Sequence, residues 1–258
     1  MMFKKKKFVR FVNEIPGVEI AHPVIHAKDY KFSWLSKLNK EVTTHNKTCP
    51  VSHTSGNTAR CPGIVDLMHK GFIITAPFDF VIKTDGDKKD LEWHMNIDPS
   101  KFNKDIKGKY ISFHPTRQLH DYTPARDDSS DLILKINTFW KLSASDDLQF
   151  LQMPIPYPEH NMFSACHGII DSNKYNEVNL QLQWHKLNGE FLVKAGTPLC
   201  QLVPLTNEKI NLKVEKMTAD DVYANNAYSY FVMHEYKKDM SNWRKNVKSI
   251  TNFLRNKN

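Results

Sequence analysis

The chain has 258 residues, of which 40% are hydrophobic and 25% are charged, a globular composition that excludes wholesale disorder. No apolar run approaches the roughly 18 residues that cross a bilayer, so we expect no membrane contact. Four cysteines are too few for a disulfide framework and favour a reducing compartment. The basic N-terminus lacks the apolar segment of a signal peptide, and we therefore expect a cytoplasmic protein.

The net charge of +8 is concentrated at the two ends of the chain. Residues 1–10 carry five positive charges and residues 236–258 a net six, which leaves residues 11–235 mildly acidic, at a net −3. This distribution disfavours a nucleic-acid footprint over the folded body. Contact with nucleic acid is expected only through the basic ends, and a solvated run of charges explains those ends without any partner.

The sequence divides into three regions. Residues 1–60 are polar and rich in turn signals, and they predict an irregular N-terminal arm with loops and short strands. Residues 61–206 contain successive strand patterns and predict one β-domain. Residues 207–258 predict a linker followed by a basic, amphipathic C-terminal helix.

Strand patterns recur through the β-domain. The run Phe72–Thr84 is apolar and β-branched and ends at Asp85-Gly86, a hairpin signal. Glu177–Trp184 alternates polar and apolar residues, as a half-buried strand does. Further strands are expected at Lys109–Phe113, Leu132–Ile136, Phe150–Ile155, Phe191–Lys194 and Leu199–Leu205. Together these patterns predict a mainly β fold.

The C-terminal region has a helical pattern. Thr218 precedes an acidic segment and is a candidate N-cap. Between residues 233 and 254, apolar residues alternate spacings of three and four, an a/d seam of about three heptads. The seam indicates either a helix that oligomerises or docks on a partner, or one that packs on its own β-domain.

A hexapeptide of the form CxGI(I/V)D occurs twice, at Cys61–Asp66 and at Cys166–Asp171. Each copy precedes a strand pattern, and its glycine permits a tight turn. The duplication predicts an internal structural repeat in which Asp66 is the counterpart of Asp171. A turn capped by each aspartate, with no ligand, remains an alternative. The proline-rich segment Pro154–His160 leads into the second copy and is a candidate pocket wall, although core packing explains its aromatic neighbours equally well.

The second copy opens the block GIIDSNKYNEVNLQLQWHKLNGEFLVKAGTPLCQLVPL at Gly168–Leu205. This block resembles the third conserved block of trimeric dUTP pyrophosphatases and the related dCTP deaminases. More weakly, Gly63–Leu67 (GIVDL) resembles the opening segment of that family. The resemblance implies a β-clip fold, which is a distorted all-β barrel, and a nucleotide ligand. It also implies a homo-oligomer, usually a trimer, formed here through the β-domain or the 233–254 helix.

The resemblance implies roles for individual residues. Asp171 would activate the attacking water, Tyr175 would stack under the deoxyribose, and Gly168, Gln201 and Asp66 would complete the ligand site, with Mg²⁺ if the protein hydrolyses nucleotides. Tyr175 lies four residues after Asp171 instead of three. With only nine glycines, the chain also lacks the family's glycine-rich phosphate loops. We therefore expect binding of a nucleotide or similar small ligand with weak or absent pyrophosphatase activity.

Residues 45–206 as a whole also resemble a family of tailed-bacteriophage proteins, through TARCPGIVDLMHKGFIITAPFDFVIKT and GTPLCQLVPL. This resemblance implies a phage protein made in the host cytoplasm or carried in the virion, and it brings no reaction with it. A second class of function is therefore open. The β-domain would then be the scaffold of a virion structural component or of a host-directed interaction protein.

Metal sites are the last alternative. Cys49, His53, Cys61 and Cys166 are candidate zinc ligands, although their spacings fit no standard zinc finger. Histidines such as His114 permit a two-His-one-carboxylate iron site, but ordinary surface and turn histidines also explain them. The sequence contains no P-loop, no G-x-S-x-G elbow and no dinucleotide fingerprint.

Overall fold

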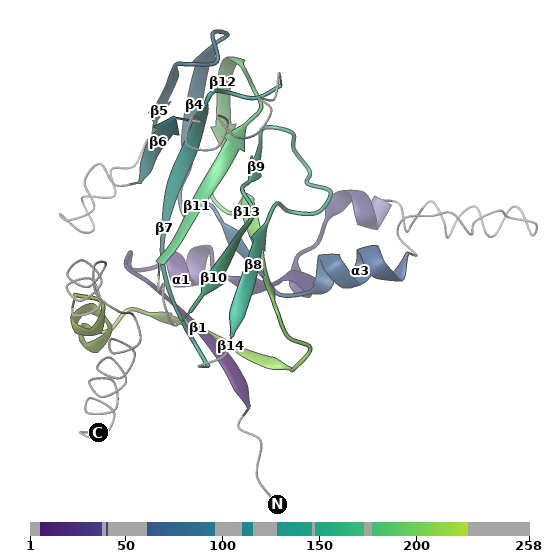
Figure 1. The fold of residues 1–258 in the computed structure, drawn as a ribbon, viewed down its shortest axis with the longest axis vertical. Helices are drawn as coiled ribbons and strands as arrows, with labels where there is room; N and C mark the ends of the chain where they lie inside the picture. The colour runs from purple at the N-terminus through teal and green to yellow at the C-terminus, as the bar shows by residue number, and fades with distance from the viewer. Residues whose placement is uncertain are drawn as a thin grey trace, which may run out of the picture.

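The computed structural model describes residues 6–37, 40, 61–95, 110–115, 128–145, 148–172 and 177–226. It confirms the mainly β fold, with a helix near the C-terminal end (Figure 1). The strands divide among three sheets, so the expected distorted barrel is not closed. The predicted seam at 233–254 lies outside the described residues.

The largest sheet, sheet A, has the order β14-β1-β7-β11-β9, and β6 also pairs with β7. Its strands are β1 (Lys7–Asn13), β6 (Ile111–Pro115), β7 (Leu132–Ala144), β9 (Phe163–Ala165), β11 (Glu177–Trp184) and β14 (Ile210–Lys216). The long β7 pairs with β11 along one edge and with β6 and then β1 along the other. It is therefore the strand that connects the two halves of the sheet.

The other two sheets are smaller, with the orders β10-β8-β13-β3-β2 in sheet B and β12-β4-β5 in sheet C. Sheet B contains β2 (Ile25–His26), β3 (Phe72–Thr75), β8 (Gln149–Met153), β10 (Gly168–Asp171) and β13 (Pro198–Pro204). Sheet C contains β4 (Phe80–Asp85), β5 (Leu91–His94) and β12 (Asn188–Val193). The predicted run Phe72–Thr84 thus forms two strands in different sheets. Pro77 lies in the break between them, where a residue without an N–H group cannot extend a ladder.

The helical segments within the described residues are short. They are α1 (Val18–Ala21), the 3-10 helix η1 (Ala27–Asp29) and α3 (Pro62–His69), and two further helical turns begin at Ser33 and Ala219. No helix in the described ranges combines the length and the hydrophobicity needed to cross a membrane.

The described part of residues 1–60 is more regular than an arm of loops and short strands, because it contributes a seven-residue strand to the main sheet. β1 lies between β7 and β14, where Val9 and Phe11 are completely buried. The Phe11 ring contacts Phe72 and Trp140 at centroid distances of 6.1 and 6.4 Å. Lys7 and Arg10 and the polar residues on either side of this apolar strand make the first 60 residues polar as a whole, which concealed a strand of the main sheet.

The two copies of the hexapeptide adopt different structures, so the predicted internal repeat is wrong. Cys61–Asp66 starts helix α3, with Pro62 in its first turn, whereas Gly168–Asp171 is strand β10. Proline is favoured at the first helical position because its missing N–H has no intrahelical partner there. The second copy instead pairs with β8. Neighbouring residues, not the shared pattern, decide which structure each copy adopts.

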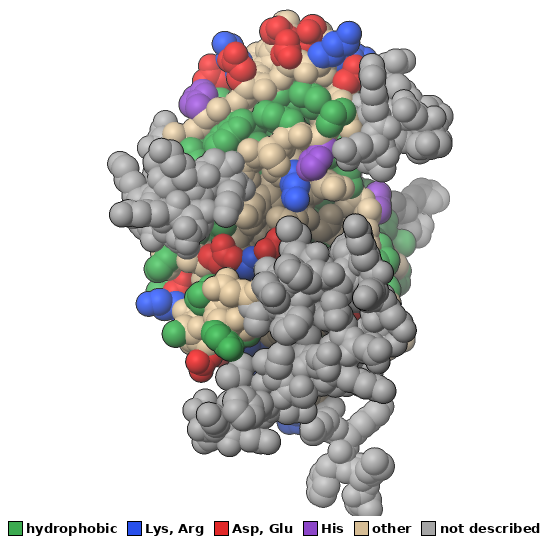
Figure 2. Space-filling model, turned by 60° about the vertical axis from the view of Figure 1, so that its left-hand side comes forward, with side chains coloured by type: hydrophobic (Ala, Val, Ile, Leu, Met, Phe, Trp, Pro, Cys, Tyr) green, Lys and Arg blue, Asp and Glu red, His purple; other side chains and the backbone are tan. Residues whose placement is uncertain are grey.

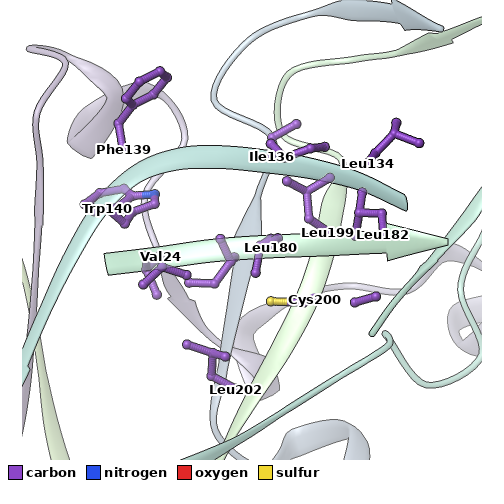
Figure 3. Close-up of a cluster of buried hydrophobic side chains, with 14 of the residues drawn as sticks. Val24, Leu134, Ile136, Phe139, Trp140, Leu180, Leu182, Leu199, Cys200 and Leu202 are labelled. Atoms are coloured by element: carbon purple, nitrogen blue, oxygen red, sulfur yellow. The ribbon is translucent and has the colours of Figure 1, made fainter. Parts of the chain in front are cut away.

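The core lies between sheets A and B. Figure 3 shows the side chains from β7 and β11 that face β13, namely Leu134, Ile136, Leu180 and Leu182 on one side and Leu199, Cys200 and Leu202 on the other. Aromatic rings extend this core toward sheet C, where Tyr110 stacks on Phe139 at a centroid distance of 5.8 Å. Burial of these rings and aliphatic side chains is the main stabilising contribution.

Gly71 connects α3 to β3 at a close approach of two segments. Its φ is +86°, and a Cβ at this position would lie 2.0 Å from the carbonyl oxygen of Leu202. A Cβ added at Gly63, within α3, would instead meet nothing within 4 Å. Both the backbone conformation and the lack of space therefore require glycine at position 71, and neither requires it at position 63.

We expect Gly71→Ala to lower the free energy of unfolding by at least about 2 kcal/mol, because strain and a backbone clash combine. Gly63→Ala is the matched control and should raise it by up to about 1 kcal/mol, since alanine restricts the unfolded chain. Urea denaturation measures both. Equal effects of the two substitutions would contradict the close approach at Gly71.

The C-terminal helix is tied to sheet A at its first turn. Thr218 is the N-cap, as predicted: its Oγ accepts the Asp221 N–H at 3.2 Å, and Asp221 Oδ2 accepts the Thr218 N–H at 2.9 Å. Arg10 of β1 donates two hydrogen bonds to the same carboxylate, at 2.6 and 3.0 Å. Burial acts to raise the pKa of Asp221, but Arg10 and Thr218 outweigh it and lower this pKa to about 2.

The Arg10–Asp221 pair should make stability depend on pH in acid. The folded-state pKa of Asp221, about 2, lies below the usual 3.8, so its contribution is present above pH 4 and is lost as the pH falls toward 2. We expect Asp221→Asn to weaken this acid dependence of the free energy of unfolding, measured by urea denaturation across that range. Glu92→Gln, which removes the exposed partner of Lys83, should leave it in place. An acid dependence unaltered by Asp221→Asn would refute the pairing.

Candidate functional site

Asp171, the predicted catalytic carboxylate, ends β10 at the edge of sheet B, and only 6% of it is exposed. Gln149 of β8 is opposite it in the register and donates from Nε2 to Asp171 Oδ2 at 3.5 Å. The adjacent Ser172 donates from Oγ to the Leu148 carbonyl at 3.0 Å. The carboxylate is thus engaged inside the protein, an arrangement suited to holding β10 on β8.

Gly168 does not converge with Asp171. Gly168 pairs with Gln152 and Asp171 with Gln149, so three residues of β8, or roughly 10 Å, separate the two positions along the strand. A Cβ added at Gly168 would meet no atom within 4 Å, and no close backbone approach requires glycine there. Tyr175 lies outside the described residues.

Gln201 has a structural role that the resemblance did not suggest. Its side chain is completely buried, and its Nε2 donates to the carbonyl oxygens of Leu67 at 2.7 Å and Lys70 at 2.6 Å. These carbonyls lie at the end of helix α3, where the Leu67 carbonyl also accepts the Lys70 N–H at 3.2 Å. Asp66 lies on the same helix and is exposed. Gln201 therefore attaches α3 to the middle of sheet B.

The sequence predicted no metal site, and the described structure does not bring the two described candidate zinc ligands together. Cys61 is exposed at the start of α3, and Cys166 is half-buried before β10. Burial raises the pKa of the Cys166 thiol, which disfavours the thiolate that binds metals. Cys49 and His53 lie outside the described residues.

One acidic group occurs at the β4–β5 hairpin, where carboxylates of Asp85, Asp87 and Asp90 lie within 4.8 Å of one another. Asp87 Oδ1 accepts the N–H groups of Lys89 and Asp90 at 2.7 and 3.0 Å, and these bonds lower the pKa of Asp87. The group is fully accounted for as a hydrogen-bonded turn.

A pocket of about 550 Å³, the lysine pocket, opens between η1, the start of β3 and the β13–β14 connection. Its volume lies in the range of small-molecule sites. Its polar lining includes His26, Lys28, Lys70, Asn207, Lys209 and Asn211, and Phe72 and Leu212 add apolar surface.

The charges around the lysine pocket favour an anion. Three lysines line it against one carboxylate, Glu208, which pairs with Lys7 at 3.7 Å. Lys70 Nζ donates to Asn207 Oδ1 at 3.3 Å. Burial, and then the charge of Lys28, lowers the pKa of His26. His26 is therefore neutral near pH 7, with one ring nitrogen able to donate and one able to accept.

No sequence motif could have located this pocket. Its lysines occupy positions 28, 70 and 209 and meet only because β2 and β13 both pair with β3. The single local signal is Gly71, which has a positive φ. Its carbonyl accepts the Ala27 N–H at 2.9 Å, and this hydrogen bond holds the end of α3 beside η1.

A second pocket, of about 430 Å³, is lined by part of the proline-rich segment, together with Phe32, Leu192 and Lys194. His160 Nδ1 accepts the Met162 N–H at 3.4 Å. Burial lowers the pKa of His160, against a smaller opposing effect of its bond to the Pro198 carbonyl. Part of the candidate pocket wall thus lines a hollow, but most of the lining side chains are apolar and their net charge is small.

We expect Gln201→Met to lower the free energy of unfolding by about 1–3 kcal/mol, because it retains volume but removes the side-chain donor to the Lys70 carbonyl. Gln183→Ala is the control, since its half-exposed amide holds no neighbouring carbonyl in the described structure, and should change stability by at most about 0.5 kcal/mol. Urea denaturation compares them. A loss below about 1 kcal/mol for Gln201→Met would contradict the assigned role.

Comparisons with known proteins leave the chain without an assigned family. No family model matches it, and neither a curated protein nor a solved structure does. The resemblances to dUTP pyrophosphatases and to phage proteins therefore stay predictions, and the function has to be argued from geometry and charge.

Proposed function

We propose that this protein binds a small phosphorylated ligand in the lysine pocket, with nucleotides as the first class to test. The observation that carries the proposal is the meeting of Lys28, Lys70 and Lys209 around one pocket of about 550 Å³. Ammonium groups are point charges with three donors each, and they suit phosphate oxygens without requiring a glycine-rich loop.

The remaining polar groups suit the rest of a nucleotide. Asn207 and Asn211 carry amides that both donate and accept, as recognition of a base or a ribose requires. His26 tilts against the Phe72 ring at a centroid distance of 5.2 Å, which places a neutral ring at the pocket wall. The Glu208 carboxylate is offset by Lys7, so it opposes an anion less than a free carboxylate does.

The proposal covers binding and includes no reaction. Asp171 is not among the residues that line the lysine pocket, and it is buried in a contact with Gln149. A general base must come within hydrogen-bond reach of the proton that it removes. The geometry therefore supports a ligand-binding protein better than a pyrophosphatase.

The test is a thermal-shift titration with dUTP, dCTP and inorganic phosphate at millimolar concentration. A ligand at about 100 times its Kd should raise the melting temperature by roughly 5–10 °C. Lys70→Gln and Lys209→Gln should each weaken binding about tenfold or more, by loss of a charge-assisted contact. Lys213→Gln removes an exposed lysine of β14 that does not line the pocket and should leave affinity unchanged.

A flat response to every phosphorylated ligand would refute the proposal. So would binding that persists at full strength in the Lys70 and Lys209 variants. In the first case the virion or interaction class of function would become the leading hypothesis, and detection of the chain in purified virions would be the next measurement.

A further inference from the structure

The second pocket, of about 430 Å³, is built from three segments that are far apart in the sequence. They are residues 30–32, the proline-rich segment and the connection between β12 and β13. The volume lies in the range of small-molecule sites. Apolar side chains form most of the wall, including Tyr30, Ile155, Met162, Leu192 and Pro198. Leu192 is 46% exposed, so the pocket offers an apolar ligand surface that the protein itself does not cover.

Side-chain hydrogen bonds join the three segments. Glu159, in the proline-rich segment, accepts the Ser33 N–H next to residues 30–32. His160 follows it, and its ring donates a hydrogen bond to the carbonyl of Pro198, the first residue of β13. A pocket that is fixed in this way needs little further ordering when a ligand binds, so more of the contact energy appears as affinity.

The backbone at Tyr157 is held in a conformation that residues other than glycine rarely adopt. Its φ is +52°, and it lies between Pro156 and Pro158 with 51% of its surface exposed. Trp34 supports this conformation, because its Nε1 donates to the Tyr157 carbonyl at 3.0 Å and its ring lies 5.9 Å from the Tyr157 ring. Backbone strain of this kind concentrates at functional sites. The two residues that follow Tyr157, Pro158 and Glu159, line the second pocket.

Two side chains of opposite charge line the second pocket without pairing. The Ser33 side chain lowers the pKa of Glu159 most, and the N–H groups of Ser33 and Trp34 and the charge of Lys37 add to this against the effect of burial. A carboxylate has about four acceptor positions, so Glu159 keeps room for a further donor. Lys194 is exposed on the connection between β12 and β13. Within the described structure, no ion pair joins Lys194 to Glu159 or to another carboxylate.

Elsewhere on the described surface, several opposite charges meet. Lys83 Nζ lies 3.3 Å from Glu92 in sheet C, and Lys141 Nζ lies 2.5 Å from Glu177 in sheet A. Figure 2 shows acidic and basic side chains side by side at the end of the molecule that sheet C forms. The charges of the second pocket differ from these, because they face one hollow and stay apart. A ligand that carries both signs can therefore bridge them.

We propose that the second pocket binds a free apolar amino acid. The carboxylate of the ligand pairs with Lys194, its ammonium group pairs with Glu159, and its side chain lies against Tyr30 and Leu192. Charge complementarity carries the proposal, because Glu159 and Lys194 are the charged residues of the lining and a zwitterion balances both of them. The proposal is independent of the lysine pocket, since the two pockets share no residue.

The experiment is calorimetric titration of the full chain with L-phenylalanine, L-leucine and L-methionine. We expect at least one of them to bind at millimolar concentration. Analogues of that amino acid then remove its charges: the N-acetyl derivative has no ammonium group, the amide has no carboxylate, and the N-acetyl amide has neither. Each analogue should bind about tenfold or more weakly, because a charged side chain of the pocket loses its partner.

Two variants assign the contacts. Lys194→Gln should weaken binding of the free amino acid about tenfold or more and should bind the amino acid and its amide alike, because the group that distinguishes them is gone. Glu159→Gln keeps an acceptor for the Ser33 N–H and should abolish the preference for the free amine in the same way. Lys213→Gln removes an exposed lysine that does not line the second pocket and should bind like the parent protein. Lys194→Gln and Lys213→Gln should melt at the parent temperature, because both lysines are exposed.

The proposal is overturned if none of the three amino acids binds at millimolar concentration. It is equally overturned if the N-acetyl amide binds as tightly as the free amino acid, a result that would indicate a peptide segment as the occupant. Unchanged affinity in Lys194→Gln would also overturn it.

Discussion

The burial of β1 between β7 and β14 is the interaction on which the rest of the structure depends. It pairs Lys7–Asn13 in parallel with Ile210–Lys216, about 200 residues later in the chain. Such a pairing carries a large entropic cost of loop closure, which the complete burial of Val9 and Phe11 offsets. Lys209 lies directly before the first residue of β14, so the pairing of β14 with β1 also fixes one side of the lysine pocket.

The other fixed point of the lysine pocket is the approach of Gly71 to β13. The Gly71 carbonyl accepts the Ala27 N–H, which brings η1 and its Lys28 beside the end of α3. Gln201 holds the Lys70 carbonyl from the opposite side. A residue that the family resemblance suggested as a ligand contact thus acts as a support, because its amide is buried under a helix terminus and does not reach a cavity.

The sequence predicted those features that local pattern determines. The strand Glu177–Trp184 has the bounds that its alternation indicates, and Thr218 caps the helix that its acidic neighbours indicate. Features that depend on partners far along the chain were not predictable. The place of β1 in the main sheet depends on its pairing with β7 and β14, and the hexapeptide resembles a repeat until Pro62 begins a helix. The lysine pocket has no local pattern at all.

Charge explains how a mildly acidic body can present an anion site. Screening limits the reach of a surface charge to about 10 Å at ordinary ionic strength, so the net −3 of residues 11–235 says little about any one pocket. What matters is the sign of the charges within that distance, and around the lysine pocket three lysines face one paired carboxylate. Beside Lys141 of β7 the same reasoning gives the opposite result, because Glu14 and Glu177 lie 2.8 and 2.5 Å away and neutralise it. A site for an anion therefore depends on which carboxylates lie within reach of its lysines, and not on the net charge of the chain.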